Sequence, residues 1–219
     1  MNPVVLLWAL KGVAESMQGR REEARQSFER AFDLGRQLDD VVAEGPPHCW
    51  ILNTLGCEDL VDPPAAMRHA ERIAELADRS SATATQLFKH WALGVACWRN
   101  GRFDEAVSHL ERMLEYSEEH LAMLGTRAFG NADLAQAWLA LDPIRARAAI
   151  ERALALRSTC WDGPRIDLVD ARVRLACGER EAAAAAVARG RALMRRLEAP
   201  SYVPEFDRLA SELGAPRGS

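Results

Sequence analysis

The feature that most constrains this chain is a short pattern repeated along it. QGRREEARQSFERAF at residues 18–32 and NGRFDEAVSHLERML at residues 100–114 are identical at six of fifteen positions. An alanine, an apolar residue four positions later and then Glu-Arg recur from Ala24, Ala66, Ala106 and Ala146, with a weaker copy from Ala183. These starting points lie 42, 40, 40 and 37 residues apart. A period in this range is typical of stacked supersecondary units.

Each repeat has the pattern of two helices joined by a short break. Apolar residues recur at spacings of three and four, which places an apolar stripe on one face of each segment. Glycine can end a first helix in the left-handed conformation, while Asp-Pro caps a second helix and fills its first turn. The glycines at these breaks are Gly19, Gly101 and Gly178, and the Asp-Pro pairs are Asp62-Pro63 and Asp142-Pro143.

This pattern predicts an all-α protein of about five helical hairpins. We expect first helices near residues 4–18, 47–60, 83–100, 121–141 and 165–177, and second helices near 21–38, 63–79, 103–117, 143–157 and 180–197. A helix near 203–213 should cap the stack. Residues 1–219 would form one repeat domain, with units at roughly 4–40, 47–79, 83–117, 121–157 and 165–197 and a loop at LDDVVAEGPPH.

Charge and cysteine content argue against several classes of partner and compartment. The net charge of −4 favours neither nucleic acid nor an anionic membrane as a partner. The five cysteines are odd in number and form no C-x-x-C pair, which favours a reducing cytoplasm over a disulfide framework or a zinc site. The apolar run VVLLWAL is too short to span a bilayer. We therefore expect a cytoplasmic protein without a membrane anchor.

Catalytic motifs are absent from the sequence. It contains no phosphate-binding glycine loop, no H-E-x-x-H helix and no G-x-S-x-G turn. The five histidines are spread one or two to a unit, so we expect them to be structural. These observations predict a protein that is not an enzyme and has no catalytic residues, metal ligands or cofactor.

The repeats resemble the tetratricopeptide repeat, in which a large aromatic residue, Leu-Gly and a bulky residue precede an Ala and a Phe in the second helix. Matching residues are Trp8, Gly12, Gly19, Ala24, Phe28 and Ala31 in the first unit, Leu93, Gly94, Gly101, Ala106 and Leu110 in the third, and Trp138, Ala146, Ile150 and Ala153 in the fourth. The period exceeds the 34 residues of that family. The resemblance implies a right-handed α-α superhelix.

More loosely, the chain is similar to the helical-repeat regions of bacterial multidomain signalling proteins that carry an ATPase module with an adenylate cyclase or a LuxR-type DNA-binding domain. The strong preference for arginine over lysine fits a GC-rich, bacterial genome. The resemblance therefore implies a role in bacterial signalling or regulation, without the catalytic or DNA-binding parts of those proteins.

In the family that the chain resembles, first helices line a concave groove, and residues beside the packing stripe face it. In the third unit the apolar residues at three- and four-residue spacing, which would share one face, are Phe88, Trp91, Val95 and Trp98. The alternative is that these aromatic residues pack between neighbouring hairpins. The predicted groove residues are Trp50, Asn53, Phe88, Trp91, Val95, Trp98, Phe129 and Gln136.

The leading interpretation is a non-enzymatic scaffold that binds a protein segment or a partner domain in an apolar concave groove. The alternative is a sensor that closes on a small apolar ligand or a signalling peptide. An apolar first helix begins almost at the first residue, and repeat arrays normally cap such a face. Either the chain is a fragment of a longer protein or its N-terminal hairpin self-associates.

Overall fold

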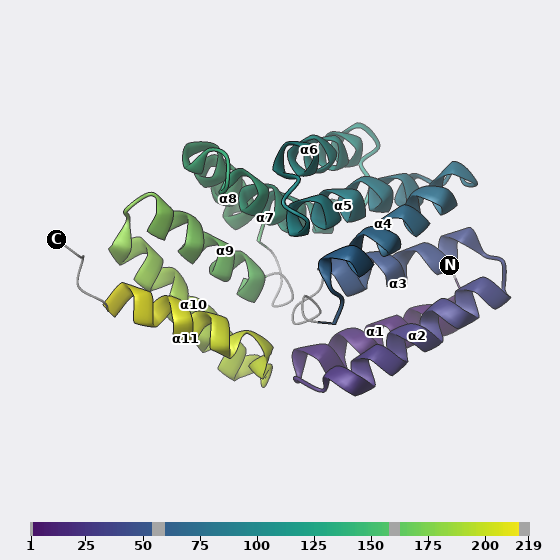
Figure 1. The fold of residues 1–219 in the computed structure, drawn as a ribbon, viewed down its shortest axis with the longest axis horizontal. Helices are drawn as coiled ribbons and strands as arrows, with labels where there is room; N and C mark the ends of the chain where they lie inside the picture. The colour runs from purple at the N-terminus through teal and green to yellow at the C-terminus, as the bar shows by residue number, and fades with distance from the viewer. Residues whose placement is uncertain (1, 54–59, 158–162, 215–219) are drawn as a thin grey trace. The chain divides into compact units, whose positions relative to one another are not determined.

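A computed structural model of the chain describes residues 2–53, 60–157 and 163–214, with the Asn53 side chain left out. These residues contain eleven α-helices, two short 3-10 helices and no strand, which confirms the all-α repeat fold (Figure 1). The chain divides into two compact units, Met1–Leu124 and Gly125–Ser219. The handedness of the stack and the single array of five hairpins stay predictions.

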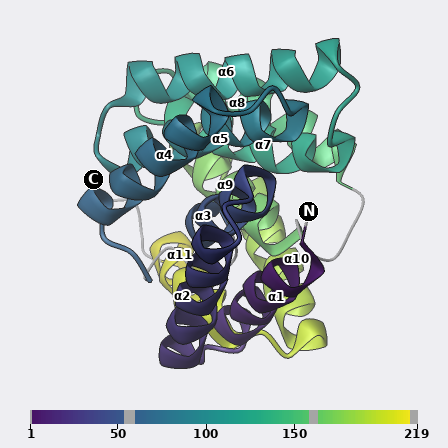
Figure 2. The same ribbon diagram turned by 90° about the vertical axis from the view of Figure 1, so that its right-hand side faces the viewer.

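Unit 1 consists of three helical hairpins, which can be followed from α1 to α6 in Figure 2. Within it, α1 packs on α2, α3 on α4, and α5 on α6. The first helices also pack on one another in sequence order, α1 on α3 and α3 on α5, as stacked repeats do. The helices are α1 (Pro3–Met17), α2 (Arg21–Gln37), α3 (Val41–Asn53), α4 (Pro63–Asp78), α5 (Thr83–Arg99) and α6 (Phe103–Glu119).

Unit 2 has two hairpins and a closing helix. Here α7 packs on α8 and α9 on α10, while α11 lies against α10 and α9. The Phe206 ring of α11 occupies the space that a side chain at Gly190 of α10 would need. The helices are α7 (Arg127–Trp138), α8 (Pro143–Leu156), α9 (Gly163–Ala176), α10 (Arg180–Leu197) and α11 (Val203–Gly214).

The breaks between helices have the conformations that the sequence predicts. Gly19, Gly101 and Gly178 have φ values of 76°, 74° and 77°, in the left-handed region that glycine enters without steric cost. Asp62 accepts a hydrogen bond from the Ala65 amide at 2.6 Å, so it caps α4. Asp142 accepts from the amides of Ile144 and Arg145 and caps α8 in the same way.

Close approach of two helices within a hairpin depends on glycine. A Cβ atom on Gly12 would lie 2.9 Å from Phe28 Cδ2, and one on Gly94 would lie 2.5 Å from Leu110 Cγ. Phe28 and Leu110 are fully buried, so neither can move aside without opening the core. In these two hairpins the first helix therefore needs a glycine opposite the large apolar residue of the second helix.

Two expected boundaries were wrong. The segment LDDVVAEGPPH is not a loop, because α3 begins at Val41 and continues through Pro46 and Pro47. Asp40 starts this helix by accepting hydrogen bonds from the amides of Val42 and Ala43 at 3.0 and 3.1 Å. Proline is favoured in the first turn of a helix, where it needs no amide hydrogen, but the Asp40 cap lies six residues before Pro46 and sets the start of α3.

The first helix of the fourth repeat is also shorter than expected. The sequence predicts it at 121–141, but α7 covers only Arg127–Trp138 and follows a 3-10 helix at Leu124–Thr126. Leu121 and Met123 have φ values of 47° and 49°, and left-handed residues of this kind cannot continue a helix. No glycine or proline before Gly125 marks this break in the sequence.

Candidate functional site

Most of the apolar face predicted on α5 is buried within unit 1. Phe88, Trp91 and Val95 are 2%, 4% and 0% exposed. The rings of Phe88 and Trp91 stack with their centroids 6.4 Å apart. The three-and-four spacing correctly places these residues on one helical face, and that face packs in the core of the unit.

Two tryptophans of the predicted set remain partly accessible in unit 1. Trp50 on α3 and Trp98 on α5 are half-buried, and these two helices pack on each other. The indole Nε1 of Trp98 is buried and has no hydrogen-bond partner in the part of the chain that is described. A buried indole N–H normally finds a partner, so Trp98 has unused hydrogen-bonding capacity. Asn53 ends α3, and its side chain lies outside the described residues.

The remaining two predicted residues belong to α7 of unit 2. Phe129 and Gln136 are both half-buried. Gln136 Oε1 accepts a hydrogen bond from Arg172 Nη1 of α9 at 3.0 Å. Arg172 Nη2 in turn pairs with Glu205 of α11 at 2.8 Å. The surroundings of Gln136 are therefore a polar bridge across α7, α9 and α11, and the predicted set falls into two groups in separate units.

Sequence analysis missed a pairing of histidines that recurs in consecutive hairpins. His48 of α3 and His69 of α4 approach with 2.7 Å between their Nδ1 atoms. In the next hairpin His90 of α5 and His109 of α6 approach with 3.3 Å between the same atoms. His90 follows His48 by 42 residues and His109 follows His69 by 40, which is close to the repeat period. This agreement is the signal in the sequence from which the pairs could have been predicted.

Burial keeps both pairs neutral. It is the largest cause lowering the pKa of His69 to about 4 and that of His90 to about 4. Burial, followed by the charge of His69, also lowers the pKa of His48 well below its usual value. The ring of His48 stacks on Phe32 with 4.2 Å between centroids. In each pair one neutral imidazole can donate its Nδ1 hydrogen to the other.

Within each unit, buried ion pairs connect neighbouring helices. Glu44 of α3, 3% exposed, accepts hydrogen bonds from Arg72 of α4 at 2.8 and 3.2 Å. In unit 2, Asp133 of α7 and Arg165 of α9 form an ion pair and are 0% and 2% exposed. Because burying a charge without a partner is costly, these pairs favour one arrangement of neighbouring helices.

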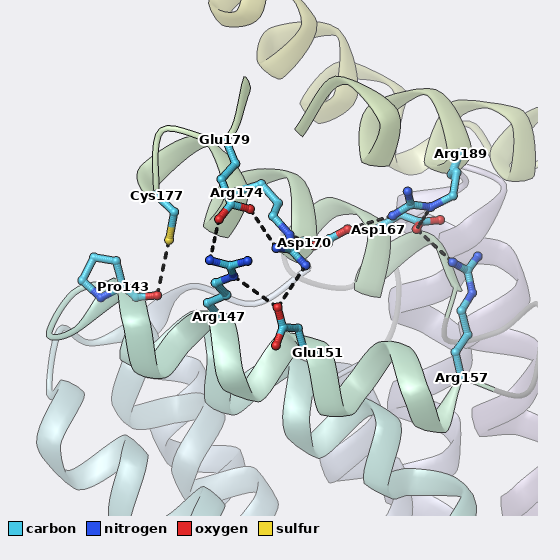
Figure 3. Close-up of polar contacts among 10 residues, drawn as sticks. All are labelled: Pro143, Arg147, Glu151, Arg157, Asp167, Asp170, Arg174, Cys177, Glu179 and Arg189. Atoms are coloured by element: carbon cyan, nitrogen blue, oxygen red, sulfur yellow. Dashed lines mark hydrogen bonds and ion pairs between the residues drawn. The ribbon is translucent and has the colours of Figure 1, made fainter. Parts of the chain in front are cut away.

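A larger network joins α8, α9 and α10 (Figure 3). Arg157 Nη1 and Arg189 Nε both donate to Asp167 Oδ1, at 2.9 and 3.1 Å. Arg189 also reaches Asp170 at 2.7 Å, and Asp170 pairs with Arg174 at 3.1 Å. Burial is the largest cause raising the pKa of Asp167, against the opposing effect of Arg157 and Arg189. Figure 3 shows the two arginines approaching Asp167 from α8 and α10.

Metal-ligating side chains, cysteines and apolar helices are the further features of the described ranges that bear on function. No group of three or more His, Cys, Asp or Glu side chains there could hold a metal ion. Cys49 and Cys97 are buried and Cys177 is half-buried, while Cys57 and Cys160 lie outside the described residues. Among the helices described, none is long and apolar enough to cross a membrane.

One comparison with known proteins identifies a family for part of the chain. Residues 90–120, which cover most of α5 and all of α6, match the family model of the tetratricopeptide repeat. No curated protein matches the chain. The matched hairpin contains Gly94, Gly101, Ala106 and Leu110, four of the residues on which the resemblance rests.

Proposed function

We propose that this chain, a tetratricopeptide-like helical-repeat protein, is a non-enzymatic scaffold that binds a segment of a partner protein along the first helices of its hairpins. The observation that carries the proposal is the match of residues 90–120 to the tetratricopeptide repeat, a module that generally mediates protein–protein interaction. All-helical repeats of this type are typically non-catalytic. The role that we propose for the scaffold is in bacterial signalling or regulation, in the cytoplasm.

We place the main contact of unit 1 at Trp50 and Trp98. Both lie on first helices, both are partly accessible, and large aromatic residues are the side chains that most often dominate the energy of an interface. A backbone carbonyl of a bound segment could accept a hydrogen bond from the indole N–H of Trp98 after a small movement of the indole.

In unit 2 the proposed contact is more polar. Phe129 would supply an aromatic anchor, and the bridge from Gln136 through Arg172 to Glu205 would supply hydrogen-bonding groups beside it. A segment bound to unit 2 would therefore carry polar groups beside an apolar side chain. At the other end of the chain, Val4 and Leu7 of α1 are 50% and 64% exposed, which supports self-association through the N-terminal hairpin.

Replacement of Trp98 by alanine is expected to abolish capture of the partner while the helical circular dichroism stays unchanged. Truncation of a central interface tryptophan typically costs about 2 kcal/mol or more of binding free energy, which is about thirtyfold in affinity. The measurement is a pull-down from native cell extract with mass spectrometry. The matched control is Trp138→Ala, because Trp138 is also half-buried but lies at the end of α7, stacked under Arg145.

Equal capture by the native protein, Trp98→Ala and Trp138→Ala would remove Trp98 from the binding surface. Substitution of Trp91 is less informative, because Trp91 is 4% exposed and its loss would disturb folding as well as binding.

Self-association is expected to be concentration-dependent if the exposed face of α1 mediates it. Leu7→Glu places a charge on that face, so the substituted chain should remain monomeric at concentrations where the native chain dimerises. Static light scattering over a range of concentrations measures this. Glu substituted for Ile144, which is 79% exposed on α8 of unit 2, is the matched control and should leave the dimer intact.

A further inference from the structure

Unit 2 carries a pocket whose lining is unusually rich in arginine. Its volume is about 480 Å³, and its lining residues are Arg157, Arg189, Ala192, Leu193 and Arg196. The last four lie on α10 at spacings of three, one and three residues, so they share one helical face. Arg157 joins them from the end of α8. The lining residues belong to the second helices and their ends, and none of them is among the residues of the proposed partner surface.

Two of the three guanidinium groups are held in place before any ligand arrives. Arg157 and Arg189 donate to the same oxygen, Oδ1 of Asp167, which is fully buried, so two positive charges are kept side by side (Figure 3). A guanidinium has five N–H donors. The contacts to Asp167 and Asp170 use one donor of Arg157 and two of Arg189, which leaves the others for a ligand.

Gly163, the first residue of α9, allows Arg157 and Leu193 of the pocket lining to pack closely against its backbone. A Cβ atom at this position would lie 2.6 Å from Arg157 Nη2 and 2.5 Å from Leu193 Cδ2. The arginine and the apolar floor of the pocket therefore both rest on a glycine backbone, and any larger residue would push them apart.

The charges around the pocket do not balance. Arg196 makes no ion pair with any described side chain, and Asp170 divides its carboxylate between Arg189 and Arg174. Three arginines thus face the carboxylate of Asp167, which two of them share, and part of the carboxylate of Asp170. An anionic ligand would restore the balance, and guanidinium forks match the oxygen atoms of phosphate better than any other side chain does.

From these features we propose that the pocket formed by Arg157, Arg189, Leu193 and Arg196 binds a phosphate monoester carried on an apolar body. The three guanidinium groups would bind the phosphate oxygens, and Leu193 with Ala192 would contact the apolar part. The volume is within the range of small-molecule sites. Either a phosphorylated side chain of a partner protein or a small phosphate ester has this chemistry.

The test is isothermal titration calorimetry of the intact chain with phenyl phosphate at low salt. Saturable binding is expected, and Arg196→Gln should weaken it about tenfold by removing one charge-assisted contact. Arg195→Gln is the matched control, because Arg195 is the exposed neighbouring arginine on α10 and does not line the pocket. It should change the affinity by less than about twofold.

Three further probes sharpen the result. Benzoate has the same ring with a single charge, and inorganic phosphate has the charge without a ring, so both should bind more weakly than phenyl phosphate. A short phosphotyrosine peptide that binds more tightly than phenyl phosphate would assign the site to a partner protein, and weaker binding would assign it to a small ester. Absence of saturable binding, benzoate as tight as phenyl phosphate, or equal losses in Arg195→Gln and Arg196→Gln would overturn the proposal.

Discussion

Replacing Arg165 with methionine is expected to lower the free energy of unfolding of unit 2 by about 3–5 kcal/mol. Asp133 and Arg165 pair in the interior between α7 and α9, and Asp133 is fully buried. Removal of the arginine leaves a carboxylate in a medium of low dielectric constant, where the loss of its partner is far more costly than at the surface. Urea unfolding followed by circular dichroism measures the change.

The double variant Asp133→Leu with Arg165→Met should recover more than half of that loss, because neither charge of this buried pair then remains. The surface pair of Arg191 with Asp207 in the same unit is the control, and Arg191→Met should cost less than about 1 kcal/mol. A single variant Arg165→Met as stable as the native chain would show that the pair contributes nothing to unit 2.

Acidification is expected to destabilise unit 1 through the buried histidines of α3 and α4. The pKa of His69 is about 4 in the folded chain, against about 6.5 for an exposed histidine. Since the folded-state pKa is the lower one, the unfolded chain takes up the proton first. Stability is therefore complete above pH 6.5 and is lost as the pH falls toward 4. Between pH 7.5 and 5, His69 alone should cost about 2 kcal/mol.

His48 should add to the effect, because burial and the neighbouring charge of His69 lower its pKa as well. Of the charged groups near this pair, Arg36, Arg68, Arg72 and Arg99 oppose protonation, and Glu44, 3.9 Å from His48 Nε2, favours it. The variant His48→Asn with His69→Asn should lose about 2 kcal/mol less than the native chain between pH 7.5 and 5 in urea unfolding, while His90, whose pKa is also lowered to about 4, keeps its own share of the loss. His120→Asn, at the exposed end of α6, should keep the native pH dependence. A double variant with the native slope would refute the assignment.

Most of the fold could be predicted because its signals are local. A left-handed glycine at Gly101, or a capping aspartate at Asp142, acts within a few residues of itself. The start of α3 was missed because two local signals compete, the cap at Asp40 and the prolines at 46 and 47, and the cap determines where the helix begins. The break at Leu121 and Met123 has no local signal, since neither residue type favours a positive φ.

The candidate site was harder to predict because it depends on packing between hairpins. Periodicity places Trp91 and Trp98 on one helical face but does not say that Trp91 is covered and Trp98 partly open. The charge network around Asp167 joins Arg157 and Arg189, which are far apart in the sequence, and no short sequence motif spans such a separation. The paired histidines were within reach of sequence analysis, because comparison of whole units aligns them.

The glycines that face Phe28 and Leu110 also bear on how the repeats could have diverged. In the last hairpin Ala171 and Val187 are buried at the same separation of 16 residues, so a slightly larger residue on the first helix accompanies a smaller one on the second. In the fourth hairpin Leu134 and Ile150 are also buried at that separation, so each hairpin fills the space between its two helices with a different pair of residues. A change at one of these positions is then best tolerated with a matching change at the other, and copies of an ancestral hairpin would drift in coupled steps here while their outward residues varied freely.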